Sequence, residues 1–195
     1  MNRNILIGMT TGASIMFGFG LVWLLLGVLV APSSMGLRVS LLLAGIAVGV
    51  SVAIMGLRAV RLPRDPLPPT AEQIAAGRAM GMRFGLVFGL ETLAILVAVA
   101  VLNRFHQPDY IPCAIAVIVG IHFFPLASSF KVPVYNVTGI LGCVAGVVTA
   151  FIADAVLRQK AVSISFGLLL WATSAWIAWK GLSHMRQIAG SSPQI

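Results

Sequence analysis

The sequence predicts an all-α integral membrane protein: a bundle of six transmembrane helices with both termini in the cytoplasm. Hydrophobic residues make up 59% of the 195 residues and charged residues only 9%, with a mean hydropathy of +1.01, whereas soluble domains carry roughly 25% charged residues. The apolar residues form continuous runs, without the alternation of a barrel strand. At about 20 residues per span, the length leaves no room for a separate soluble domain, so we expect residues 1–195 to form one transmembrane domain.

Six apolar runs are the expected spans. They lie at about 5–30, 37–60, 84–102, 110–130, 137–157 and 161–180. The first is longer than the core of a signal peptide, which has about 7–15 residues, so we expect a retained helix. Because the first and third spans contain similar segments, as do the ends of the second and sixth, three repeated hairpins are a second interpretation.

The connection at 61–83 is expected to hold a cytoplasmic linker followed by a helix. Prolines between residues 62 and 69 exclude a helix there, because proline lacks the amide donor and restricts the residue before it. Thr70, with Gln73 three residues later, has the pattern of a capping box. We therefore expect the third helix to begin about four turns below the membrane. An amphipathic segment on the membrane surface is the alternative.

The charge pattern predicts the orientation and the lipid partner. The chain has 13 Lys+Arg against 5 Asp+Glu. Because successive spans alternate in direction, nine of the basic residues fall on one side of the membrane and four on the other. The nine are Arg3, Arg58, Arg61, Arg64, Arg78, Arg83, Lys131, Lys180 and Arg186, and the four are Arg38, Arg104, Arg158 and Lys160. Because positive charge is retained on the cytoplasmic side, both ends should face the cytoplasm, in the cytoplasmic (inner) cell membrane. The same residues should meet anionic lipid headgroups. No basic stripe with interleaved aromatic residues is present, so nucleic acid is not an expected partner.

Three ionisable residues fall inside the expected spans: Glu91, His122 and Asp154. A charge at the bilayer centre costs about 2.5–3.5 kcal/mol, so such residues are usually paired, protonated or functional. Glu91 follows Arg83 by eight residues and His122 precedes Phe130 by eight, which puts both about 12 Å from the same membrane edge. We expect these two to form a pair, and Asp154 to reach headgroups or water at the outer end of its span.

His122 lies in the segment Gly120-Ile-His-Phe-Phe-Pro-Leu-Ala127. Pro125 cannot donate to the carbonyl of Ile121 and should bend the helix. A free carbonyl, an imidazole and a bend within one turn are typical of polar sites that line a cavity. The segment resembles a G-x-H-F-x-P-L-A stretch of uncharacterised small polytopic bacterial membrane proteins. These have no established activity, so the resemblance implies only that His122 is not incidental.

Two functions of different class follow. The first is a small transporter or channel-like protein in which Glu91, His122 and Pro125 form a substrate or proton site. The alternative is a structural or accessory membrane subunit without transport or catalysis. The sequence has no nucleotide loop, paired carboxylates or metal-ligand spacing. We therefore expect no catalytic residue, no metal and no cofactor.

Glycines at four-residue spacing predict close helix packing, because small residues let two backbones approach in lipid. We expect them to join helices of one chain, with a homodimer interface as the alternative. These glycines are Gly77, Gly81, Gly85 and Gly89 before and within the third span, Gly45 and Gly49 in the second, and Gly142 and Gly146 in the fifth.

Overall fold

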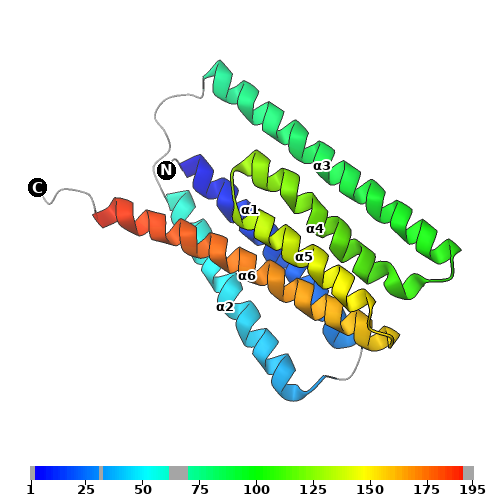
Figure 1. The fold of residues 1–195 in the computed structure, drawn as a ribbon. Helices are drawn as coiled ribbons and strands as arrows, with labels where there is room; N and C mark the ends of the chain where they lie inside the picture. The colour runs from blue at the N-terminus through cyan, green and yellow to red at the C-terminus, as the bar shows by residue number, and fades with distance from the viewer. Residues whose placement is uncertain (1–2, 31–32, 62–69, 191–195) are drawn as a thin grey trace, which may run out of the picture. The chain divides into compact units, whose positions relative to one another are not determined.

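The computed structural model describes residues 3–30, 33–61 and 70–190, and over these ranges the protein is all-helical (Figure 1). It has six α-helices and one short 3-10 helix. In chain order these are α1 (Arg3–Leu29), α2 (Met35–Arg61), α3 (Ala71–Arg104), η1 (Pro108–Tyr110), α4 (Ile111–Phe130), α5 (Val134–Ala150) and α6 (Ala155–Gly190).

Five of these helices are long and apolar enough to cross a membrane: α1, α2, α3, α6 and the segment that joins η1 to α4. The sixth apolar helix, α5, has only 17 residues. It rises about 26 Å, slightly less than the roughly 30 Å of hydrocarbon in a typical bilayer. The composition and lengths therefore indicate a multi-helix membrane protein.

The expected boundaries of the last two spans, at 157 and 161, are wrong. α5 ends at Ala150, where the N–H groups of Phe151 and Ile152 donate to the carbonyls of Val148 and Thr149. This tight turn satisfies carbonyls that the helix end leaves open. Asp154 does not continue α5: its carboxylate accepts from the Leu157 amide at 2.6 Å and begins α6. Asp154 is thus an exposed cap between two helices.

The start of α3 confirms the capping box. Thr70 Oγ1 accepts from the Gln73 amide at 3.2 Å, and Gln73 Oε1 accepts from the Thr70 amide at 3.0 Å. The helix then runs unbroken to Arg104 for 34 residues, a length of about 51 Å. The amphipathic segment and the third apolar run are therefore one helix. The proline-rich residues 62–69 lie outside the described residues.

The chain divides into two compact units, and α1 and α6 contribute to both. The first unit comprises Met1–Val22, Ser33–Leu67 and Leu170–Ile195, and the second comprises Trp23–Pro32 and Pro68–Leu169.

In the first unit, α6 packs on α1 and α2 through polar groups that use backbone carbonyls. The Trp171 indole N–H donates to the Phe17 carbonyl at 3.1 Å, and the two rings stack at 5.7 Å. Ser174 Oγ donates to the Ala13 carbonyl at 2.8 Å. A Cβ on Gly45 would lie 2.5 Å from the Trp171 ring. The missing side chain of Gly45 therefore makes room for the indole.

In the second unit, α3, α4 and α5 lie side by side (Figure 1), with α4 in contact with both neighbours. Glycines set the distance between α4 and α5. A Cβ on Gly139 would lie 2.8 Å from the Gly120 carbonyl, and one on Gly146 would lie 2.8 Å from the Cys113 carbonyl. Gly142 makes room for the Phe166 ring of α6.

The four glycines of α3 do not have the expected packing role inside their unit. A Cβ on Gly77, Gly81, Gly85 or Gly89 would meet no described atom within 4 Å. The contacts of α3 with α4 come instead from Phe84 and Glu91. Each helical residue turns the side-chain direction by about 100°. Gly85 therefore points to one side of the α4 contact that Phe84 makes, and not into it.

We expect Gly146→Ala to destabilise the protein and Gly18→Ala to leave it unchanged or slightly more stable. Both changes improve helix propensity by about 1 kcal/mol, but only the Cβ at position 146 meets backbone atoms of α4, whereas none lies within 4 Å of position 18. Overpacking of this kind costs about 1–3 kcal/mol. Thermal unfolding in detergent measures the difference. Equal melting temperatures for the two variants would contradict the proposed contact.

Candidate functional site

The structure brings Glu91 and His122 together, as their equal depth predicts. Glu91 Oε1 of α3 lies 3.1 Å from His122 Nδ1 of α4, and the two side chains are only 8% and 15% exposed. Two turns earlier on α3, Phe84 packs edge to face against Phe130, two turns after His122 on α4. Moving two turns back along α3 and two turns forward along α4 leads from one contact to the other, as expected for neighbouring antiparallel helices. The Glu91–His122 pair is therefore part of the packing between α3 and α4.

The pair leaves two polar atoms unsatisfied. His122 Nδ1 is within ion-pair distance of Glu91 Oε1 but has no hydrogen-bond partner among the described residues. Glu91 Oε2 is buried and also lacks one. Buried polar atoms in native proteins almost always have partners, and exceptions concentrate at reactive or hydrated positions. The contact is therefore a close approach of two ionisable groups rather than a fully satisfied structural bond.

Aromatic packing holds the imidazole in place. The His122 ring lies nearly parallel to the ring of Phe123, with centroids 4.9 Å apart. Phe123 is buried and contacts the Tyr135 ring of α5 at 5.8 Å. The orientation of His122 therefore depends on the packing between α4 and α5, as well as on α3.

Pro125 lies inside α4, which is assigned as one helix from Ile111 to Phe130. The Ser128 hydroxyl donates to the Pro125 carbonyl at 3.0 Å. Pro125 is thus within one turn of His122, as expected. The bend and the free Ile121 carbonyl remain predictions.

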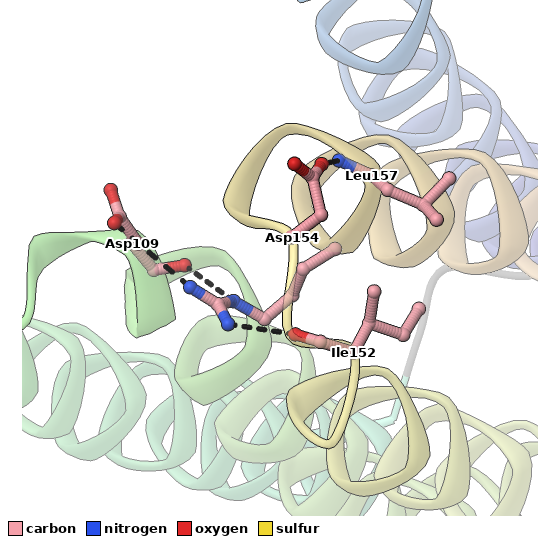
Figure 2. Close-up of polar contacts among 5 residues, drawn as sticks. Asp109, Ile152, Asp154 and Leu157 are labelled. Carbon is pink, nitrogen blue, oxygen red and sulfur yellow. Dashed lines mark hydrogen bonds and ion pairs between the residues drawn. The ribbon is translucent and has the colours of Figure 1, made fainter.

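Sequence reasoning missed a buried cation, Arg158. It is 3% exposed in the first turn of α6, whereas the expected spans, which end at 157 and begin again at 161, place it in the loop between them. Its Nε donates to the Asp109 carbonyl at 3.3 Å and its Nη1 to the Ile152 carbonyl at 2.8 Å. Figure 2 draws these bonds as dashed lines to the labelled Asp109 and Ile152; Arg158 is the side chain without a label. The guanidinium carbon lies 3.9 Å from the centroid of the Tyr110 ring.

Arg158 connects two loops at one end of the second unit. Its partners come from η1, which precedes α4, and from the connection between α5 and α6 (Figure 2). The Asp109 carboxylate is 62% exposed and only reaches Nη2 at 4.0 Å, so this ion pair contributes little. The carbonyl bonds and the ring contact stabilise the buried charge. The sequence pattern that could have predicted this contact is Asp109-Tyr110 next to one helix and Arg158 next to another. The two parts are far apart in the chain and have no fixed spacing, so the pattern cannot be recognised as a motif.

These features define an apolar, all-helical membrane protein with a buried carboxylate–imidazole contact. The chain belongs to DUF7010, a family of unknown function, which it matches over residues 78–180. That range includes Glu91, His122 and Arg158. Searches of curated proteins and of solved structures find no match.

We expect Arg158→Gln to lower the melting temperature, with a loss of about 1.5–3 kcal/mol, the usual contribution of hydrogen bonds to charged groups. Arg158→Lys should not restore it, because an ammonium cannot reproduce the fork of donors and the stacking. Arg104→Gln is the control, since Arg104 is an exposed residue at the end of α3. The measurement is thermal unfolding in detergent. Full stability of Arg158→Gln would show that the buried guanidinium does not hold the loops.

Proposed function

We propose that this protein is a small transporter or channel-like protein of the cytoplasmic membrane, in which Glu91 and His122 pass a proton. One observation carries the proposal: the 3.1 Å contact between two buried ionisable side chains that leaves Nδ1 and Oε2 without hydrogen-bond partners among the described residues. Ionisable residues inside a membrane are costly, and they are therefore functional candidates by default.

The chemistry of the pair suits proton exchange. The neutral pair and the ion pair differ by the position of one proton. Its transfer between Glu91 Oε1 and His122 Nδ1, which lie 3.1 Å apart, requires the two atoms to align as a hydrogen bond. Imidazole is the side chain that ordinarily changes protonation in the physiological range. Separating charge in a dry site is expensive, because both groups lose water.

The proposal includes six spans with both termini in the cytoplasm. The positions of the basic residues support it through the positive-inside rule. The slight shortness of α5 is compatible with a span, because a bilayer accommodates a short helix by local thinning. In this orientation Glu91 and His122 lie in the cytoplasmic half of the membrane.

The competing structural interpretation treats the pair as a link between α3 and α4. Interhelical polar contacts in membrane proteins contribute about 0.6 kcal/mol on average. A contact selected for stability would be expected to satisfy its atoms, since an unpaired buried group costs about 1–3 kcal/mol. The unsatisfied Nδ1 and Oε2 therefore favour a site over a structural link.

Reconstituted wild-type protein should pass protons into liposomes that contain a pH-sensitive dye when a potassium diffusion potential is imposed. We expect Glu91→Gln and His122→Gln to reduce this flux to the level of protein-free liposomes, because neither amide exchanges a proton. Glu72→Gln is a matched control: it removes an exposed carboxylate from the same helix and should retain the flux.

Wild-type flux equal to that of protein-free liposomes, or full flux in Glu91→Gln, would contradict the proposal. Thermal unfolding of the same variants separates the two interpretations. Residues held for function often cost stability, so neutral or stabilising substitutions favour a site. Two destabilising single substitutions, with a double variant no worse than either, favour a structural pair.

A second candidate, an accessory subunit, is favoured by α3. Apart from the Glu91 side chain, which is 8% exposed, its described residues are at least partly exposed, and its four glycines meet nothing within their unit. Such a face suits close approach of another helix in lipid, and a second copy of the chain is the simplest partner.

If α3 joins two copies, Gly81→Leu and Gly85→Leu should lower the dimer fraction in bilayers without lowering the melting temperature. The added side chains block close approach of a second α3 but meet no described atom of their own unit. Single-molecule photobleaching of labelled protein counts the copies. Gly18→Leu, an equally open position on α1, is the control. An unchanged dimer fraction, or a wild type that is monomeric, would exclude this interface.

A further inference from the structure

Three helix ends meet at one end of the first unit. A Cβ on Gly181 of α6 would lie 2.5 Å from Met55 Sδ of α2 and 3.8 Å from Leu6 Cδ2 of α1. Leu6 and Met55 are fully buried. The beginning of α1 and the last turns of α2 and α6 are therefore level with one another.

Exposed basic residues adjoin this contact along α2 and α6. Arg58 follows Met55 by three residues and so lies on the same face of α2, one turn further out. Lys180 adjoins Gly181, and His184 lies one turn beyond it. We call Arg58, Arg61, Lys180 and His184 the basic end; all four are exposed. The described residues of the first unit contain no aspartate or glutamate, so no carboxylate among them neutralises this charge.

Two exposed tryptophans lie beside the charge. The rings of Trp176 and Trp179 are 5.3 Å apart and are 46% and 56% exposed. The Lys180 ammonium lies 5.4 Å from the first ring and 6.0 Å from the second. Cation–π attraction at these distances holds the ammonium near the indoles. Tryptophan with a neighbouring cation is the arrangement found at the level of lipid headgroups.

We propose that the basic end binds the headgroup of an anionic phospholipid. The ligand's phosphate accepts hydrogen bonds from the Lys180 ammonium and the Arg58 guanidinium, while the indoles of Trp176 and Trp179 pack against its glycerol and upper acyl chains. A lipid is favoured over a soluble anion or an acidic protein because the cations stand beside exposed aromatic rings on apolar helices, where acyl chains are the solvent. This site is independent of the proton site.

Tryptophan fluorescence tests the proposal on the full chain. Trp176 and Trp179 lie at the site, whereas Trp23 and Trp171 are 8% and 4% exposed. The chain is reconstituted in phosphatidylcholine bilayers with rising fractions of dibrominated phosphatidylglycerol or dibrominated phosphatidylcholine, whose bromines quench nearby indoles. We expect a relative binding constant for the anionic lipid of about five or more, because a basic residue near an anionic surface contributes roughly a fivefold preference.

Variants locate the site. Lys180→Gln and Arg58→Gln should each lower the relative binding constant about fivefold, and Lys180→Arg should keep it. Arg38→Gln is the matched control, because Arg38 is an exposed residue of α2 about 30 Å away along the helix. It should keep the wild-type preference. The double variant Trp176→Phe, Trp179→Phe should lose the selective quenching.

Several results would overturn the proposal. A wild-type relative binding constant near one would show no preference for the anionic lipid. An equal loss in Arg38→Gln and Lys180→Gln would show diffuse attraction by net charge. Reversal of the quenching by glycerophosphate at constant ionic strength would show a site for a soluble anion. Selective quenching that persists without Trp176 and Trp179 would place the lipid elsewhere.

Discussion

The close approach of α4 and α5 is the constraint on which the candidate site depends. Gly120 and Gly139 bring the two backbones together, and no larger residue fits without displacing backbone atoms. This contact sets the rotation of α4 about its axis. His122, two residues after Gly120, points about 200° away and therefore faces α3 and Glu91 rather than α5. The glycines thus place the imidazole without touching it.

The chain uses its few polar side chains to satisfy backbone or cap helices, as expected where water is scarce. Arg158, Trp171 and Ser174 each donate to a carbonyl of a distant segment, and Asp154 caps α6. Glu91 and His122 are different, because they are two ionisable groups that meet each other inside the apolar bundle; among the described residues Ser163 Oγ also lacks a hydrogen-bond partner, but it is not ionisable. This contrast within one molecule distinguishes the proposed proton site from polar contacts that stabilise the fold.

Much of the helical organisation could be predicted, because its signals are local. The capping box at Thr70 and Gln73 needs only residues three apart, and the length of an apolar run indicates a helix directly. The predicted end of the fifth helix is wrong for an equally local reason. The prediction includes Asp154 in the apolar run, whereas Asp154 caps the next helix. Glu91 and His122 meet as their equal depth predicts, because both positions can be counted from the expected membrane edge of their spans, at Arg83 and Phe130.

The sequence by itself determined that this is an apolar helical protein, where most of its helices begin to within about three residues, and that Glu91 and His122 can meet. These properties follow from composition, local hydrogen bonding and a fixed rise per residue. Only the tertiary structure decided which glycines pack against a neighbouring helix and that the four glycines of α3 meet no atom of their unit. It also decided that Arg158 is buried between two loops. The physical reason is that the rotation of a helix about its axis depends on how its side chains fit those of distant segments. Glycine repeats occur on packed and on unpacked helix faces alike, so their spacing does not predict which face meets a neighbour.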